Sequence, residues 1–311
     1  MREQINKPKH GSQEWLNVRW KDESGKARIS ASVAAVVHNC HPYQTPADLA
    51  TELLADTPPV PVKPNAAMER GNRFEPVLLE WASEVTGMKI ETPEVMYAYW
   101  DSDVRLIATL DGMREDGVPV EVKTTKKKWE GKLPPSWYWQ GVQQAICTDS
   151  TEIEWVIFDG EQLMHFHTQT ITSDEKQKHL DQCREFLSAI DNGVPPSGVF
   201  LEYKHASELF PDDDGGSVEL PSEAQVLLEQ LNKTKEMKKH LEEQENRIKG
   251  DLGIMLGESE KGTINGKVVV TWKTVKKNSF DMERFESEHP ALVNKYRKQS
   301  QYRMMKVTGG K

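Results

Sequence analysis

Apolar residues recur at helical spacing in several segments of the chain. The clearest segment follows Asn65 and ends at Gly87, and one of its faces carries Phe74, Leu78, Trp81 and Val85. Pro76 predicts that the regular helix begins there or is kinked, because proline cannot donate a backbone hydrogen bond inside a helix. The proline-rich residues 41–65 are predicted to form a loop. Further helices are predicted at residues 12–20, 134–148 and 173–193. Residues 28–37 are predicted to form a turn followed by a helix that Ser30 or Ser32 caps.

Alternating or short apolar runs predict five strands between these helices. They cover residues 94–100, 104–111, 118–124, 152–160 and 163–171. The resulting order is helix, three strands, helix, two strands and helix, which is typical of an α/β fold in which helices flank a central mixed sheet.

A change of character at "PDDDGGS", residues 211–217, predicts a boundary between a domain at 1–210 and an extension at 211–311. The extension begins with a long amphipathic helix, whose stripe is expected to pack against the rest of the protein: Leu227, Leu231, Leu241, Ile248, Leu252 and Met255, interrupted by Thr234, Lys238 and Glu245. A hairpin with Asn265 and Gly266 at its turn follows. Two short helices and a last strand are predicted over residues 280–307.

Composition and charge narrow the class of protein. With 37% apolar and 29% charged residues in 311, the chain is typical of a globular protein of one or two domains. It has no long apolar run for a membrane span, and its polar N-terminus lacks a signal-peptide core, so a cytoplasmic location is expected. Three scattered cysteines argue against a disulfide framework and a CxxC metal site.

The net charge of −9 argues against a protein that binds nucleic acid through overall positive charge. Residues 261–311, however, hold 12 Lys and Arg against 4 Asp and Glu, so the C-terminal end is basic. Two interpretations stay open: this end contacts the DNA backbone, or it is a structural cap or oligomer contact. A second basic stretch, Lys126, Lys127 and Lys128, follows the strand at 118–124 and predicts a DNA-contacting loop.

The candidate catalytic residues lie in the predicted hairpin "LIATLDGMREDGVPVEVKT". Because side chains alternate along a strand, Glu121 and Lys123 share one face, and Asp111 projects opposite the core side at the end of the preceding strand. If the strands pair, the two carboxylates and the lysine converge. Carboxylates are suited to Mg²⁺ or Mn²⁺, and such a site favours phosphodiester hydrolysis. The competing interpretation is that Asp111 starts a turn and the other two form a surface ion pair.

Three further features extend the candidate site. Glu75 lies one position from the apolar face of its helix and can lean over the sheet as another ligand. The next helix along the chain carries three amides that could bind a phosphate or a water: Gln140, Gln143 and Gln144. Arg19 and Ser32 combine a guanidinium with a hydroxyl near a helix start, which is typical of a terminal-phosphate site. For each of these residues, the competing interpretation is a polar side chain that is merely solvated at the surface.

Six blocks in order, "SQEWLNVRW", "RISAS", "RGNRFEP", "LDG", "VEVKT" and "YWQGVQQAICT", resemble the YqaJ-type viral recombinase family, which includes phage lambda exonuclease and belongs to the PD-(D/E)xK nucleases. The resemblance covers about residues 10–200. It implies a restriction-endonuclease-like mixed sheet and Mg²⁺-dependent 5′ to 3′ degradation of linear double-stranded DNA that leaves 3′ single-stranded tails. It also implies a phage or prophage origin, an annealing protein as partner and a trimeric ring.

The resemblance also implies roles for single residues. The metal ligands are Asp111, Glu121 and the Val122 carbonyl, with Glu75 acting through a second metal or its waters, and Lys123 is the catalytic lysine. Arg19 and Ser32 line a pocket for the 5′-phosphate, although the insertion "WKDESGKA" lengthens the link between them. An ungapped match puts Gly141 where the family has glutamine, so that role falls to Gln140 or Gln143.

Two alternatives to this exonuclease remain. One is another nuclease of the same superfamily, either a restriction-type endonuclease or a RecB-like nuclease. Three scattered cysteines cannot supply the four that bind an iron–sulfur cluster in the CRISPR-associated RecB-like type. The other is a non-catalytic DNA-binding recombination mediator, which has no reason to keep two carboxylates beside phosphate.

Overall fold

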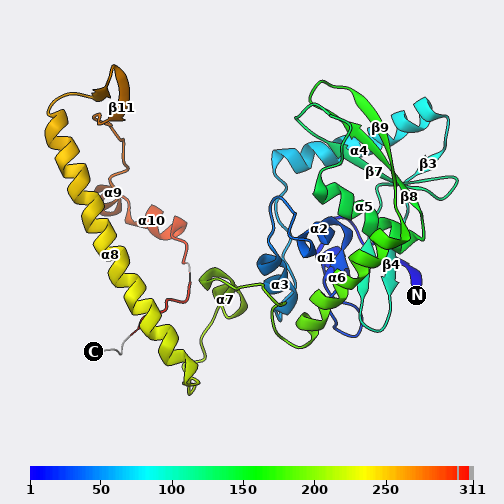
Figure 1. Cartoon of the computed structure of the whole chain (residues 1–311), viewed down its shortest axis with the longest axis horizontal. Coiled ribbons are helices and arrows are strands. Elements are labelled where there is room, and N and C mark those ends of the chain that lie inside the picture. Colours follow the sequence, from blue (N-terminus) through cyan, green and yellow to red (C-terminus); the bar gives the residue numbers. More distant parts are fainter. Residues whose placement is uncertain (300, 308–311) are drawn as a thin grey trace. The chain divides into compact units, whose positions relative to one another are not determined.

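The computed structural model describes residues 1–299 and 301–307 (Figure 1). It contains two compact units, Met1–Phe210 and Pro211–Lys311, each with its own internal packing. None of the helices among the described residues has the length and apolar character needed to cross a membrane.

The first unit contains two mixed sheets flanked by helices, so the predicted fold class is confirmed. One sheet has the strand order β1 (Arg2–Asn6), β4 (Val95–Trp100), β5 (Arg105–Ala108) and β2 (Ile29–Ser30). The other has the order β3 (Ile90–Glu91), β6 (Gly112–Arg114), β7 (Pro119–Thr124), β8 (Glu152–Phe158) and β9 (Met164–Thr170). The sequence predicted a single central sheet; instead the chain leaves one sheet after Ala108 and enters the other at Gly112.

Pairing within both sheets is mostly antiparallel. The exceptions are β2 beside β5 and β7 beside β8, which run parallel. The β7–β8 pair sets Glu121 opposite Trp155 and Lys123 opposite Ile157. Paired residues lie on the same face of a sheet, so Glu121 and Lys123 share the face toward α5 with Trp155 and Ile157. The alternate residues Val120, Val122 and Val156 pack on the other face, against α4.

Eight helical segments belong to the first unit: α1 (Gln13–Trp20), the 3₁₀ turn η1 (Ala31–Val33), α2 (Ala34–Val37), α3 (Pro46–Leu54), α4 (Ala66–Thr86), α5 (Pro135–Thr148), α6 (Ser173–Asp191) and α7 (Tyr203–Leu209). Helix α3 lies in the segment predicted to be a loop. Thr45 and Asp48 form a reciprocal capping box at its start, and Pro46 occupies the first helical position, where a missing N–H costs nothing.

Helix α4 confirms the predicted start after Asn65, whose side chain caps it, and the predicted end at the left-handed Gly87. It runs through Pro76, so the alternative in which the helix begins at the proline is wrong. Of its predicted apolar face only Leu78 is buried, together with Leu79 and Ala82. The side chain of Phe74 is exposed and packs edge-on against Phe158.

Helix α5 is the central element of the core. It packs against β4 and β5 of one sheet and against β7 and β8 of the other. Its residues 141–147 are all buried. The fully buried Trp155 of β8 donates its indole N–H to Gln169 Oε1 at 3.0 Å, and Gln169 donates to the Tyr138 carbonyl of α5 at 3.1 Å. This bridge holds α5 close to β8 and β9.

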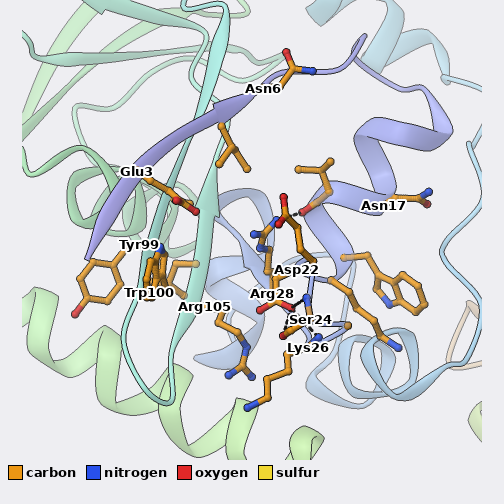
Figure 2. Close-up of a pocket in the computed structure, with 18 of the residues that line it drawn as sticks. Glu3, Asn6, Asn17, Asp22, Ser24, Lys26, Arg28, Tyr99, Trp100 and Arg105 are labelled. Carbon is orange, nitrogen blue, oxygen red and sulfur yellow. Dashed lines mark hydrogen bonds between the residues drawn. The ribbon is translucent and has the colours of Figure 1, made fainter.

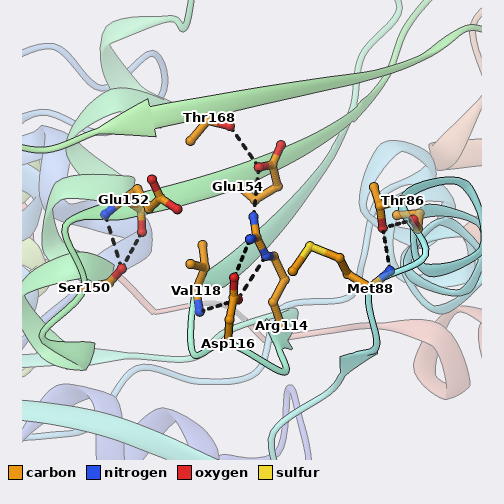
Figure 3. A network of polar contacts seen from close by, with 10 residues as sticks. Thr86, Met88, Arg114, Asp116, Val118, Ser150, Glu152, Glu154 and Thr168 are labelled. Carbon is orange, nitrogen blue, oxygen red and sulfur yellow. Dashed lines mark hydrogen bonds and ion pairs between the residues drawn. The ribbon is translucent and has the colours of Figure 1, made fainter.

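A network of charged and polar side chains spans β6, β8 and β9 of the second sheet (Figure 3). Arg114 of β6 donates to Asp116 in the β6–β7 turn and lies 3.5 Å from Glu154 of β8, whose carboxylate also accepts from Thr168 of β9 at 3.0 Å. These contacts connect three of the strands by side chains in addition to the backbone ladder. They hold the β6–β7 hairpin in position.

The second unit contains α8 (Glu223–Leu256), a hairpin of β10 (Lys261–Ile264) and β11 (Lys267–Thr271), α9 (Met282–Glu288) and α10 (Pro290–Tyr296). The helical and hairpin extension is confirmed, with Asn265 and Gly266 both at positive φ in the turn. The predicted last strand is wrong, since residues 301–307 contain none; residue 300 lies outside the described residues. Helix α8 contains no buried residue, so the expected packing of its stripe is not found in the described structure.

Gly141 has no room for a side chain. A methyl group there would lie 2.3 Å from Gln169 Oε1 and 3.0 Å from the Trp155 ring. Gly141→Ala should therefore break the bridge to β8 and lower the free energy of unfolding by about 1–3 kcal/mol, measured by urea denaturation. Gly71→Ala is the matched control: that helical position is open, and alanine there should stabilise by about 0.5–1 kcal/mol. Equal stability of the two variants would contradict the close packing.

Candidate active site

The first carboxylate of the candidate site is fixed by the backbone of the neighbouring strand. Asp111 directly precedes β6, and its Oδ2 accepts the N–H of Val122 in β7 at 2.8 Å. That bond holds the carboxyl group beside the middle of β7 while Gly112 pairs with Val120. Asp111, next to the start of β6, therefore lies beside the middle of β7, which is the convergence that the sequence predicted for this hairpin.

Glu121 and Lys123 lie on the same face of β7. Lys123 Nζ donates to Glu121 Oε1 at 2.6 Å, and the Glu121 residue is only 3% exposed. A surface ion pair would be solvated on both sides, so the competing interpretation from the sequence does not describe Glu121. The carboxylate is buried, and its charge has to be compensated by the protein.

Two glutamines of α5 supply further hydrogen bonds to the buried Glu121 carboxylate. Gln140 Nε2 donates to Glu121 Oε1 and Gln144 Nε2 donates to Glu121 Oε2, each at 2.5 Å. Residues four apart lie on one face of a helix, which is why both reach the same carboxylate. The sequence named Gln144 with Gln140 and Gln143 as an amide that could bind a phosphate or water; in the structure it binds the Glu121 carboxylate instead.

Gln143, the other predicted candidate, does not reach Glu121. Its Nε2 donates to the carbonyls of Ile29 and Ile107 at 2.8 and 3.1 Å, so its Oε1 is the acceptor that faces His179 at 3.0 Å. His179 Nε2 therefore carries the proton, and burial lowers the pKa of this histidine to about 3, which keeps it neutral. Gln143 joins α5 to β2 and β5 and is a structural residue here.

The electrostatics of the site are dominated by an excess of buried carboxyl groups. Burial raises the pKa of Asp111 well above its usual range, and Glu121 and Glu75 raise it further. Burial and then Glu121 likewise raise the pKa of Glu75, so this residue of α4 belongs to the same group. Burial lowers the pKa of Lys123, but Glu121 and Asp111 outweigh that effect and the result lies above the ordinary value.

These donors fit a hard divalent cation. One ammonium faces three carboxyl groups, and carboxylate and carbonyl oxygens are the ligands that Mg²⁺ and Mn²⁺ prefer. Across the described residues, no three side chains from His, Cys, Asp and Glu form a complete metal site. A cation would therefore bind Asp111, Glu121, a backbone carbonyl such as that of Val122, and water. The buried Gln144 Oε1 has no partner and is available to such a water.

The predicted phosphate-binding residues are also brought together. Arg19 of α1 donates to Ser30 Oγ at 2.8 Å and to Ser32 Oγ, and its guanidinium lies 3.9 Å from the centre of the Trp15 ring. Burial lowers the pKa of Arg19 to about 10, with Glu52 acting in the other direction, so the group is still a cation at neutral pH. None of the ion pairs formed by the described residues involves Arg19.

The insertion between Arg19 and Ser30 does not separate them. Lys21 and Ala27 form a β-bridge that closes the inserted residues into a side loop. Within that loop Asp22 accepts from the Ser24 hydroxyl at 2.6 Å and from the Lys26 N–H at 2.9 Å. The additional residues therefore leave the Arg19–Ser30 contact intact.

The basic stretch after β7 is exposed. Lys126, Lys127 and Lys128 follow the strand, and Lys128 forms an ion pair with Glu161 at 3.1 Å. The structure gives these residues no role beyond that contact.

A cavity of about 900 Å³ lies elsewhere, between β1, the loop at residues 21–28 and the end of β4 (Figure 2). Arg28, Tyr99 and Arg105 are among the residues that line it, and none of the predicted site residues does. The carboxylate group and this cavity are therefore separate features of the first unit.

Comparison with known proteins supports the resemblance drawn from the sequence. Residues 14–151 match the family model of the YqaJ-like viral recombinase domain, which confirms that resemblance. No curated protein matches the chain in sequence.

Solved structures with some likeness include an alkaline exonuclease from Laribacter hongkongensis. It is 20% identical, with 58% of this chain and 93% of that chain covered and a TM-score of 0.45. The same exonuclease in complex with dAMP is 19% identical at the same coverage, with a TM-score of 0.47. A structure of SSO0001 is 13% identical over 53% of this chain and 75% of its own, with a TM-score of 0.35.

Replacing Asp111 with asparagine should raise the melting temperature of the protein without divalent ions at about pH 8. The folded state holds the pKa of Asp111 above its unfolded value of about 3.9. Stability is therefore lost as the pH rises from that value through the raised pKa, and a neutral amide removes the loss. A gain of about 1 kcal/mol corresponds to roughly 2–4 °C for a domain of this size. Calorimetry across this pH range measures the difference.

Asp116→Asn is the matched control for that measurement. Arg114 lowers the pKa of the exposed Asp116, so its charge favours the folded state at neutral pH. The asparagine variant should melt at or slightly below the wild-type temperature. If Asp111→Asn also melts at or below the wild-type temperature at about pH 8, the interpretation of Asp111 as a destabilising buried charge is wrong.

Proposed function

Residues 14–151 carry a YqaJ-like viral recombinase domain, and from that premise we propose that the protein is a Mg²⁺-dependent exonuclease. Its substrate would be the end of linear double-stranded DNA, degraded from 5′ to 3′ so that 3′ single-stranded tails remain for homologous recombination. The observation that carries the proposal is the convergence of Asp111, Glu121 and Lys123 with two glutamines bound to the Glu121 carboxylate.

In the proposed site Asp111, Glu121 and the Val122 carbonyl would hold Mg²⁺, for which Mn²⁺ could substitute, and Glu75 would hold its water or a second ion. The cation would supply Lewis acidity for activating a water. Gln140 and Gln144 hold the plane of the Glu121 carboxylate, since each donates to a different oxygen. They are positioning residues.

Lys123 is proposed as the catalytic lysine. Its raised pKa keeps it protonated at neutral pH, so it is suited to donating to a phosphate oxygen rather than to accepting a proton from water. The positive charge would stabilise the additional negative charge that develops on the phosphate during hydrolysis.

Arg19 and Ser32, together with Ser30, are proposed to bind the 5′-phosphate at the end of the DNA. A guanidinium and two hydroxyl groups can all donate to phosphate oxygens, and Arg19 has no carboxylate that competes for it within hydrogen-bond distance. Such a contact would set the distance from the DNA end to the bond that is cut. Lys126, Lys127 and Lys128 are proposed to contact the DNA backbone beside the metal site.

The wider assignments are proposals as well. Residues 1–210 would be the exonuclease domain and 211–311 an extension. The enzyme would act in the cytoplasm of a bacterial host, encoded by a phage or prophage, with a single-strand annealing protein as partner. A homo-trimer around the DNA is the proposed assembly for the first unit.

Incubation of end-labelled linear duplex DNA with the protein and Mg²⁺ tests the activity. The wild type should degrade the duplex and leave a circular plasmid intact. Glu121→Gln and Lys123→Ala should each lower the rate by about 100-fold or more. The first weakens the proposed metal site, and the second removes the positive charge beside the reacting phosphate. Glu154→Gln is the matched control: it alters a half-buried carboxylate on the neighbouring strand and should keep the activity.

The outcomes separate the alternatives. Cleavage of circular plasmid would favour a restriction-type endonuclease. DNA binding without Mg²⁺-dependent cleavage would favour a non-catalytic mediator. Activity that persists in EDTA, or in both site variants, would overturn the proposed chemistry.

The 5′-phosphate site makes a separate prediction. The wild type should degrade 5′-phosphorylated ends faster than 5′-hydroxyl ends, and Arg19→Ala or Ser32→Ala should reduce that ratio by about tenfold or more for the arginine. Rates on 5′-hydroxyl ends should change little, so this substrate is an internal control. Arg184→Ala, which alters a surface arginine of α6 paired with Asp101 and Asp181, should leave the ratio unchanged. An unchanged ratio in Arg19→Ala would show that the phosphate is bound elsewhere.

A further inference from the structure

Helix α8 carries the spacing of a coiled-coil seam. Nine positions along the helix are separated by steps that alternate between four and three residues, as in a heptad repeat. They are Leu227, Leu231, Thr234, Lys238, Leu241, Glu245, Ile248, Leu252 and Met255. Six of the nine are apolar, and over these 28 steps the seam is about 42 Å long. A stripe at 3.5-residue spacing is typical of a helix that pairs with another helix.

Among the described residues of the second unit, 211–299 and 301–307, none buries this seam. None of the 34 residues of α8 is buried, and Leu227, Leu241 and Ile248 are 65%, 63% and 60% exposed. The β10–β11 hairpin packs beside the C-terminal end of α8, where Trp272 lies next to Gly253. An exposed apolar stripe of this length on a helix without a packed face indicates a missing partner.

The polar residues within the seam indicate which partner fits. Lys238 and Glu245 both occupy a positions, one heptad apart. In a parallel, in-register pair with a second copy, Lys238 would face Lys238 and Glu245 would face Glu245 in the middle of the interface. Like charges opposed in this way are destabilising. In an antiparallel pair, each Lys238 lies about one turn from the Glu245 of the second copy, so two Lys238–Glu245 contacts outnumber the one Lys238–Lys238 contact near the centre.

We propose that α8 pairs with α8 of a second copy of this chain in an antiparallel coiled coil. In the register that fits best, Leu227 faces Leu252 and Leu231 faces Ile248 of the second copy, so both ends of the interface are apolar. Thr234 faces Glu245 and Lys238 faces Leu241 around the centre, where the two central Lys238 side chains can reach the opposing carboxylates. The pairing concerns α8 alone and does not depend on the proposed nuclease activity or on an assembly of residues 1–210.

A charge exchange in the full-length protein tests both the contact and its direction. Lys238→Glu and Glu245→Lys should each weaken self-association by about 100-fold or more, because each brings like charges together in the antiparallel pair. The solution mass measured by light scattering should fall by half. The double variant Lys238→Glu/Glu245→Lys restores complementary charges and should regain the wild-type mass. In a parallel pair the double variant would gain nothing.

Matched controls exist on the outer face of the same helix. Lys238 and Glu245 each form an ion pair with a residue four positions away, Lys238 with Glu242 and Glu245 with Lys249. Lys239→Glu and Glu243→Lys remove an equivalent pair at outward positions and make the same charge changes. Both controls should keep the wild-type mass. Circular dichroism of every variant verifies that α8 remains helical.

Three outcomes would overturn the proposal. One is a wild-type mass of a single 35.4 kDa chain at about 100 µM, where an interface of micromolar affinity is formed. Another is a larger mass that neither single variant lowers, which would place the contact outside α8. The third is a double variant with no recovery, which would exclude the antiparallel direction.

Discussion

The buried charge of Glu121 is the constraint on which the first unit depends. A carboxylate that is removed from water destabilises the fold by several kcal/mol unless donors replace the lost hydration. Three donors do so here: Lys123 from the same strand and Gln140 and Gln144 from α5. Two of the three come from one helix, so α5 has to lie close against β7. Gly141 allows that approach, because it leaves space for the Gln169 and Trp155 side chains between the helix and the sheet.

The same arrangement explains how the two candidate sites are connected. Gln143 lies on a different face of α5 from the two glutamines that bind Glu121, and it donates to the carbonyl of Ile29, directly before Ser30. Ser30 in turn accepts from Arg19. One helix therefore positions the carboxylate group on β7 and the arginine–serine group at β2. Asp111 and Glu75 remain without full compensation, and the raised pKa of each reflects that. In the proposed metal site, this imbalance would lower the stability of the protein without the cation and favour binding of the cation.

Local signals predicted most elements correctly and failed where several signals competed. The proline-rich loop concealed α3, although Thr45, Pro46 and Asp48 together are a capping box with proline at the first helical position. Pro76 left two alternatives open, a helix start or a kinked helix, and the structure excludes the first because α4 is capped by Asn65 and continues through the proline. The stripe of α8 was expected to pack within the protein. Periodicity shows that a face is apolar, but it does not show what covers it.

The sequence by itself determined the features that depend on neighbouring residues. Strand alternation places Glu121 and Lys123 on one face, the turn between Asp111 and Val120 brings their strands together, and the steps of four and three define the α8 seam. Contacts between distant segments were decided only by the tertiary structure. Which glutamine reaches Glu121 depends on the rotation of α5 against β7, and the contact of Arg19 with Ser30 depends on the inserted residues closing into a side loop. Neither rotation nor loop closure leaves a local pattern, because both are set by packing across the core.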